Sequence, residues 1–141
     1  MKKKTVFITG CKGTLGKKLV SYYLKKDFKV IGTSRNIKKK FIKSKNLTVF
    51  KLDMSNNDDF LKLVNNLNKK KIIIDTLINN AATASGSLTE MTSMKNLKNE
   101  FEINFFSQIK LIQNLLRFMK KSVNPSIINI GSISGLIPER G

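Results

Sequence analysis

The chain has 141 residues, of which 40% are hydrophobic and 26% charged, and this is enough for one domain with its own core. No apolar run approaches the roughly 20 residues of a membrane-spanning helix, and the run after the basic N-terminus is too short for a signal peptide. We therefore expect a cytoplasmic protein that does not enter a membrane. The single cysteine, Cys11, agrees with a reducing compartment because it has no partner for an internal disulfide.

The net charge of +18 results from 27 basic and 9 acidic residues. Such an excess can indicate a surface for nucleic acid or an anionic membrane. Here the basic residues are almost all lysines in short, scattered clusters, without an arginine-rich segment or an accompanying series of aromatic residues. Solvated helix faces and loops are the favoured interpretation, and no nucleic-acid partner is expected.

The strongest local signal lies near the N-terminus, where Val6 to Ile8 form an apolar run typical of a strand and glycines follow at positions 10, 13 and 16. Apolar residues from Leu15 to Leu24 then recur at helical spacing. A strand, a tight glycine turn and a helix point backbone N–H groups and a helix N-terminus at one place, which suits a pyrophosphate. The alternative is a plain strand-to-helix turn.

Each glycine has a predicted role: Gly10 permits the turn, Gly13 lets the backbone approach the phosphates, and Gly16 lets the helix pack closely. The spacing Thr-Gly-x-x-Gly-x-x-Gly resembles the short-chain dehydrogenase/reductase superfamily, and its extended branch more than its shorter one. The resemblance implies an NAD(P) cofactor. The predicted phosphate loop, residues 10–16, comprises Gly10, Cys11, Lys12, Gly13, Thr14, Leu15 and Gly16.

A second strand is predicted over Phe28 to Gly32, and Thr33-Ser34-Arg35 follows it. An acidic residue here would bind the ribose 2′-hydroxyl of NAD, but the sequence has none. Ser34 can donate a hydrogen bond, Arg35 can pair with a phosphate through two N–H groups, and Lys12 could add a second positive charge. We therefore expect NADP rather than NAD, with Arg35 as an ordinary surface cation the alternative.

Asn36 to Asn46 is a basic connection or a short helix, and Leu47 to Leu52 is a third strand. The resemblance implies that Asp53 and Met54, which follow it, lie beside the adenine, where the carboxylate can accept from the exocyclic amine. Alternatively Asp53 or Ser55 caps the next helix, and the two roles are compatible. That helix is predicted over Asp58 to Asn68.

The fourth strand, Ile72 to Ile78, is almost continuously apolar, as expected of a parallel strand covered on both faces. Asn79-Asn80-Ala81-Ala82 follows and resembles the superfamily motif Asn-Asn-Ala-Gly, with Ala82 in place of the glycine. The resemblance implies that this segment braces the central strands and that Asn80, Ala81 and Ala82 contact the cofactor.

A long helical pattern runs from Glu90 to about Lys121, with a break expected near Asn99. We expect its buried face to contain Phe101, Phe105, Ile109, Ile112, Leu115, Leu116 and Met119. Asn104 falls on that face, and buried asparagines usually have a partner or a role. It resembles the superfamily asparagine that holds a water near the catalytic lysine, although a simple hydrogen-bonded helix asparagine is the alternative.

The fifth strand is predicted over Ser126 to Ile130, followed by Gly131-Ser132-Ile133-Ser134-Gly135. This segment resembles the superfamily segment whose serine orients the substrate carbonyl. Ser132 occupies the matching position, and Ser134 is the second candidate. In the superfamily a Tyr-x-x-x-Lys pair follows, but none follows Ser132; Tyr22 and Lys26 have that spacing only on the first predicted helix.

Strands and helices alternate throughout, so we expect residues 1–141 to form an α/β, Rossmann-like domain with a doubly wound parallel sheet in the order 3-2-1-4-5, incomplete at the C-terminus. The resemblance implies the N-terminal part of a longer NADP(H)-dependent oxidoreductase that interconverts a carbonyl and an alcohol, inactive as given. NAD is the alternative cofactor. We also expect a small-molecule substrate, with a sugar nucleotide as one candidate. The full-length enzyme is expected to be a homo-oligomer, and no metal site is expected. The alternatives are a non-catalytic dinucleotide-binding module or sensor and, from charge alone, a nucleic-acid-binding protein.

Overall fold

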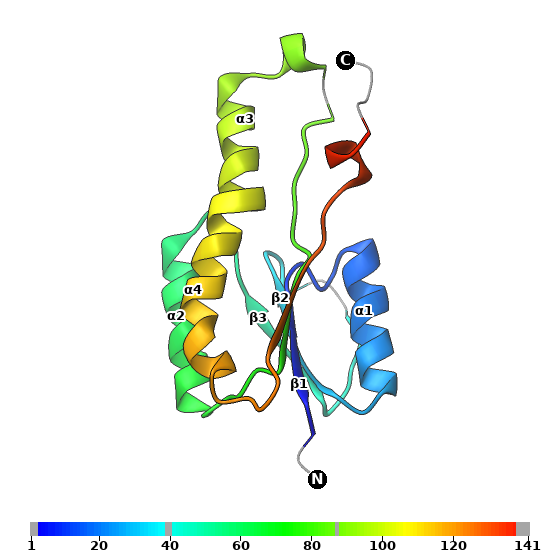
Figure 1. Ribbon diagram of the computed structural model, residues 1–141, viewed down its shortest axis with the longest axis vertical. Helices are drawn as coiled ribbons and strands as arrows, with labels where there is room; N and C mark the ends of the chain where they lie inside the picture. The colour runs from blue at the N-terminus through cyan, green and yellow to red at the C-terminus, as the bar shows by residue number, and fades with distance from the viewer. Residues whose placement is uncertain (1–2, 39–40, 87, 138–141) are drawn as a thin grey trace.

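The computed structural model describes residues 3–38, 41–86 and 88–137. Its centre is a five-stranded sheet in the order β3-β2-β1-β4-β5 with every neighbouring pair parallel, which confirms the predicted Rossmann-like topology. Helix α1 covers one face of the sheet, and α2 and α4 cover the other (Figure 1). The strands are β1 (Thr5–Ile8), β2 (Lys29–Ser34), β3 (Leu47–Lys51), β4 (Thr76–Asn79) and β5 (Ser126–Asn129).

The helices are α1 (Thr14–Lys25), α2 (Asn57–Lys69), α3 (Met94–Phe101) and α4 (Ser107–Met119), with a π-helical turn over Glu102–Phe106 between the last two. Short 3₁₀ turns lie at Thr89–Met91 and Ile133–Gly135. Among the described residues, no helix is both long enough and apolar enough to cross a membrane. In the connection between β2 and β3, residues 36–38 and 41–46 contain no helix, and Lys39 and Lys40 lie outside the described residues.

Two apolar cores lie on opposite faces of the sheet because side chains alternate along each strand. Phe7 of β1 faces α2 and α4, where it joins Leu63, Leu77 and Leu111. The neighbouring residues of β1 face α1 instead, in a smaller cluster of buried side chains: Val6, Ile8, Cys11, Val20, Val30 and Ile78. Because these strands run parallel, the carboxyl ends of β1, β2 and β4 lie at one edge, which the helices on the two faces leave open.

Helix α2 begins with a side-chain cap that differs from both candidates proposed from the sequence. The side chain of Asn56 accepts hydrogen bonds from the N–H groups of Asp58 and Asp59. The capping role proposed for Asp53 or Ser55 is therefore wrong, because the helix starts at Asn57 and Asn56, directly before it, is the N-cap. Asp53 instead lies at the open edge of the sheet, directly after Leu52.

The long C-terminal helix buries a different face from the one expected. Ile103, Ser107, Leu111, Leu115 and Phe118 form the buried stripe, whereas Phe101 and Phe105 are 57% and 55% exposed. Ile109 and Leu116 of the expected face are also exposed, while Leu115 and Met119 are buried as expected. The helix is apolar along two sides, and the rest of the described chain covers only one of them. The break comes at residues 102–106, close to the expected position.

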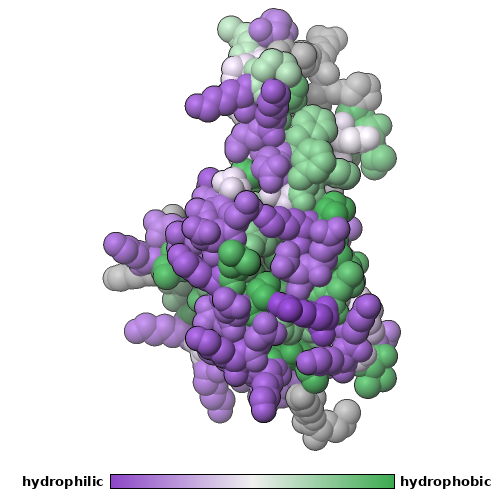
Figure 2. All heavy atoms as spheres, turned by 90° about the vertical axis from the view of Figure 1, so that its left-hand side faces the viewer, coloured by the Kyte–Doolittle hydropathy of each residue, from purple (hydrophilic) through white to green (hydrophobic). Residues whose placement is uncertain are grey.

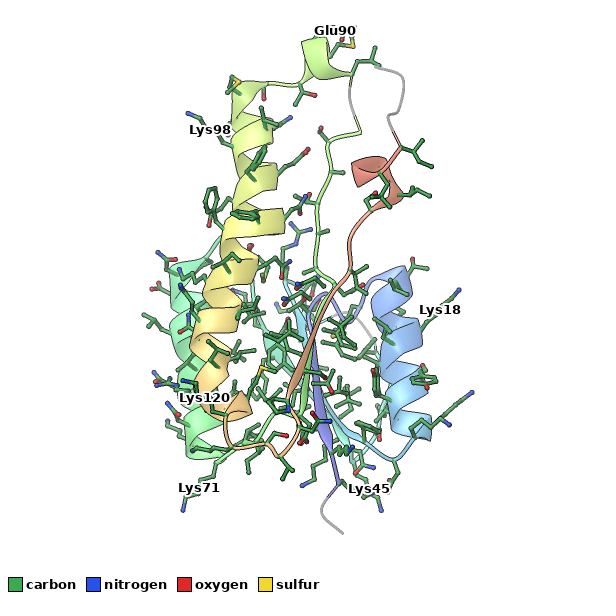
Figure 3. All side chains as sticks on the ribbon, in the orientation of Figure 1. Lys18, Lys45, Lys71, Glu90, Lys98 and Lys120 are labelled. Carbon is green, nitrogen blue, oxygen red and sulfur yellow. The ribbon has the colours of Figure 1, made fainter. Side chains whose placement is uncertain are left out.

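The lysines are spread around the molecule. Lys18 on α1, Lys98 on α3, Lys71 after α2 and Lys120 after α4 all project outward from different elements (Figure 3). Figure 2 shows hydrophilic side chains over most of the face that α2 and α4 present, with apolar side chains visible between them in the middle of this face and towards the end where α3 lies. This distribution is typical of solvated helix faces and differs from a single basic stripe.

Candidate functional site

A cavity of about 450 Å³ opens at the carboxyl ends of β1, β2 and β4, where the strand order reverses and ligands bind in sheets of this kind. Every residue predicted to contact a cofactor lines this cavity except Cys11. Its walls also contain residues that the sequence did not single out. The lining residues are Gly10, Lys12, Gly13, Thr14, Leu15, Gly16, Thr33, Ser34, Arg35, Asn36, Leu52, Asp53, Met54, Asn80, Ala81, Ala82, Thr83 and Ile103.

The phosphate loop forms one wall, and its glycines are required for different reasons. Gly10 has a φ of +61°, and a Cβ there would lie 3.1 Å from the Cα of Ala81. A Cβ at Gly16 would lie 2.9 Å from the Cα of Cys11, so this glycine lets α1 pack against the turn itself. At Gly13, the N-cap of α1, a Cβ would meet only the carbonyl oxygen of Gly10, at 3.4 Å. The first turn of α1 contains no acidic residue, so this N-terminus suits an anion.

The side chains of Lys12, Ser34 and Arg35 form what we call the cationic end of the cavity. The Nζ of Lys12 donates to the carbonyl oxygen of Ile37 at 2.8 Å and lies 5.6 Å from the ring centroid of Phe41. The hydroxyl of Ser34 donates to the carbonyl oxygen of Asn36 at 3.3 Å. Arg35 is exposed, so its guanidinium can turn towards an anionic group in the cavity.

Asp53 lies farther along the same wall with its carboxylate in an ordered turn. Its Oδ1 accepts from the N–H of Ser55 at 3.1 Å and from the Ser55 hydroxyl at 2.8 Å. Partial burial raises the pKa of this carboxyl, but the Ser55 hydrogen bonds and the charges of Arg35 and Lys51 outweigh that effect and leave the pKa below its usual value. Asp53 is therefore an ionised acceptor at neutral pH. Beside it, Leu52, Met54 and Ile103 supply apolar wall that a flat aromatic base could contact.

Hydrogen bonds between Thr9 and Asn80 join the ends of β1 and β4 at the base of the cavity. The Thr9 hydroxyl accepts from the N–H groups of Asn80 and Ala81, each at 2.8 Å. The Asn80 side chain donates in return to the carbonyl oxygen of Thr9 at 2.8 Å. Sequence reasoning missed Thr9, although its place directly before the glycine turn could have indicated it.

Asn104 lies on the π-helical turn and is exposed, not buried as the helical periodicity suggested. Its Oδ1 accepts from the N–H of Thr83 at 2.9 Å, and its Nδ2 donates to the carbonyl oxygen of Thr83 at 2.7 Å. Both polar atoms of the amide thus hold the segment that leaves β4. Turns of this type in helices frequently lie at functional sites.

Ser132 lies after β5 and caps the 3₁₀ turn that follows. Its hydroxyl oxygen accepts from the N–H of Ser134 at 3.2 Å, and the two hydroxyls are 3.1 Å apart. Neither Ser132 nor Asn104 is among the residues that line the cavity. Both belong to segments at the open, carboxyl edge of the sheet, where the chain extends beyond the strands (Figure 1).

Comparison with known proteins gives consistent results. The model of the short chain dehydrogenase family matches residues 4–141. The chain is 34% identical over 146 residues to a 3-oxoacyl-[acyl-carrier-protein] reductase of Buchnera aphidicola, covering 100% of the chain and 59% of the relative. It is 29% identical over 143 residues to a 3-ketodihydrosphingosine reductase of Bacteroides thetaiotaomicron, covering 100% of the chain and 52% of that relative. The chain thus spans somewhat over half the length of these relatives.

Solved structures give the same picture. A short chain dehydrogenase from Leptospira borgpetersenii with bound NAD+ superimposes with a TM-score of 0.89 at 26% identity, covering 99% of this chain and 56% of that one. ElxO with NADP bound superimposes with a TM-score of 0.85 at 29% identity, covering 98% of this chain and 59% of the ElxO chain. These similar folds therefore include one with bound NAD+ and one with bound NADP.

Proposed function

Because this chain belongs to the short-chain dehydrogenase family and corresponds to the N-terminal portion of its members, we propose that it forms the cofactor-binding part of an NADP(H)-dependent oxidoreductase. The reaction interconverts a carbonyl and an alcohol by hydride transfer. One observation carries the proposal: a single cavity contains both a glycine-rich helix N-terminus and a cationic end without an acidic residue at the end of β2.

The lining residues fit a dinucleotide phosphate. The N-terminus of α1 supplies N–H donors for the pyrophosphate, and the bare Cα of Gly13 leaves room for it. Asp53, with its lowered pKa, is an acceptor suited to the adenine amine. We assign Ala81 and Ala82, which line the cavity, to the ribose; they belong to a segment that Thr9 and Asn80 hold in place.

The preference for NADP(H) rests on residues of this chain. Ser34 and Arg35 end β2, where an NAD-binding member of such folds has an acidic residue that accepts from the ribose 2′-hydroxyl. A guanidinium there can pair with a 2′-phosphate through two N–H groups, and Lys12 brings a second positive charge to the same end. We therefore assign Lys12, Ser34 and Arg35 to the 2′-phosphate.

The cofactor and the side chains of the protein each supply groups for the reaction. When bound, the reduced nicotinamide supplies the hydride. The Ser132 hydroxyl can donate a hydrogen bond to the substrate carbonyl and hold its orientation. Asn104 fixes the Thr83 backbone with both atoms of its amide, so we assign it a positioning role. The proton donor is expected from a Tyr-x-x-x-Lys pair, which does not follow Ser132 in this sequence.

Residues 1–141 alone are expected to bind NADPH without oxidising it, because a general acid typically contributes about 10²–10⁴-fold to such reactions. The test compares NADPH consumption by this chain and by a protein in which it continues into a Tyr-x-x-x-Lys helix. The substrates are a 3-oxoacyl thioester, a long-chain keto amine and a keto sugar nucleotide. Turnover by residues 1–141 alone would contradict the proposed division of roles. No turnover with the longer protein would favour the non-catalytic sensor.

We also propose that the protein self-associates through the uncovered apolar side of α3 and α4. The exposed large apolar side chains of α3, α4 and the π-helical turn between them include Met94, Phe101, Phe106 and Ile109, a concentration typical of an interface. Light scattering should give a mass above the monomer for the parent and a monomer for Phe101→Glu. Leu61→Glu serves as a matched control, because Leu61 is 63% exposed on α2. A monomeric parent at tens of micromolar would contradict this proposal.

A further inference from the structure

Cys11 belongs to the phosphate loop, but its side chain lies beneath the loop, completely buried in the apolar cluster on the α1 face. Burial raises the pKa of its thiol to about 11 although the charge of Lys12 opposes the shift. A thiol of this kind is neutral at physiological pH and poorly nucleophilic. Its contribution to the protein is therefore packing, and its neighbours define what that packing does.

The Cys11 side chain lies against Gly32 of β2. A Cβ at Gly32 would lie 2.6 Å from the Sγ of Cys11 and 2.8 Å from its Cβ, distances at which the atoms would overlap. Gly32 has no positive φ and pairs regularly with Ile8 and Val49, so the strand itself does not require glycine. Glycine within a strand often marks a place where another part of the chain approaches closely. Here it admits Cys11.

The same contact connects two parts of the cavity. The N–H of Cys11 donates to the carbonyl oxygen of Thr33 at 2.9 Å, directly beside the Gly32 contact. Lys12 and Gly13 follow Cys11 in the loop, and Ser34 and Arg35 follow Thr33 in the strand. The packing of Cys11 on Gly32 and this hydrogen bond therefore both lie between the loop and the end of β2.

We propose that Cys11 and Gly32 form a positioning pair that holds the phosphate loop at the distance from Ser34 and Arg35 that NADPH requires. The inference rests on the proposed function and names residues that set its cofactor preference. NADPH carries anionic groups at both places, and charge-assisted hydrogen bonds weaken when donor and acceptor are displaced. NADH lacks the 2′-phosphate, so the same displacement costs it less.

Gly32→Ala should raise the Kd of NADPH about tenfold, roughly the loss of one charge-assisted hydrogen bond, and raise that of NADH clearly less. The second substitution then tests the contact itself. Cys11→Gly removes both atoms that the new Cβ would overlap, whereas Cys11→Ala removes only the Sγ. The double variant Gly32→Ala/Cys11→Gly should therefore come closer to the parent's preference for NADPH over NADH than Gly32→Ala/Cys11→Ala does.

Gly135→Ala is the matched control, because a Cβ at Gly135 would meet nothing within 4 Å. An unchanged ratio of the two Kd values in Gly32→Ala, or an equal loss of both affinities together with a lower Tm, would overturn the inference. If Gly32→Ala does not fold, Cys11→Ala is tested in its place. The ratio of the NADH Kd to the NADPH Kd should then be a few-fold lower than in the parent, and an unchanged ratio would again overturn the inference. A parent that binds neither cofactor would instead overturn the proposed function, and the pair with it.

Discussion

Gly13→Val is expected to abolish NADPH binding while the protein stays folded. The backbone at Gly13 has φ −71° and ψ 172°, an extended conformation that valine adopts readily. A Cβ there meets only the carbonyl oxygen of Gly10, at 3.4 Å, so the two methyl groups would extend into the cavity that Gly13 lines. They would occupy the space assigned to the pyrophosphate. Loss of two charge-assisted hydrogen bonds alone would weaken binding at least about 100-fold.

Calorimetric titration with NADPH measures this loss, and a circular-dichroism melting curve checks the fold. Gly135→Val is the control, since Gly135 lies outside the cavity and a Cβ there has no neighbour within 4 Å. The two variants should melt at similar temperatures and differ only in binding. If Gly13→Val binds NADPH as the parent does, residues 10–16 do not hold the pyrophosphate.

Arg35→Asp is expected to reverse the cofactor preference from NADPH to NADH. A carboxylate at this position repels a 2′-phosphate and accepts from a 2′-hydroxyl, so the two cofactors should respond in opposite directions. Losing a charge-assisted pair and gaining a repulsion should shift the ratio of their Kd values by about 100-fold or more. The fold should be unaffected because Arg35 is exposed.

The control for this variant is Arg117→Asp, which changes the net charge equally. Arg117 is exposed on α4 and does not line the cavity. Titrations at two salt concentrations separate a local contact from a general loss of positive charge, since screening weakens the general effect. The same shift in Arg117→Asp would mean that overall charge, and not Arg35, determines the preference.

The topology could be predicted from the sequence because the relevant signals are local. Short apolar runs such as Val6 to Ile8 alternate with helical repeats, and the glycines at positions 10, 13 and 16 mark the turn between the first strand and helix. The dinucleotide-binding fold that this turn indicates then predicts the strand order 3-2-1-4-5. The carboxyl ends of adjacent strands meet at one edge, so Ser34, Asp53 and Asn80, each within two residues of the end of a predicted strand, could be expected to lie together.

Other features depend on contacts between distant residues and could not be read from local pattern. The helical segment formed by the π-helical turn and α4 is apolar on two sides. Periodicity alone does not say that Ile103 and Leu111 are buried while Phe105 is exposed. Gly32 looks like an ordinary strand residue until Cys11 is placed against it. Asn104 has helical spacing consistent with burial, yet the π-helical turn directs its amide to Thr83.

Direct titration of the parent protein with NADPH and with NADH, at one salt concentration, tests the central claim of a cavity built for NADP(H). Saturable NADPH binding is predicted, because the N-terminus of α1 and the cationic end of the cavity are placed to hold the pyrophosphate and the 2′-phosphate together. NADH should bind more weakly, since it has no 2′-phosphate and engages only the N-terminus of α1. No saturable binding of either cofactor, or equal affinity for both, would contradict the account.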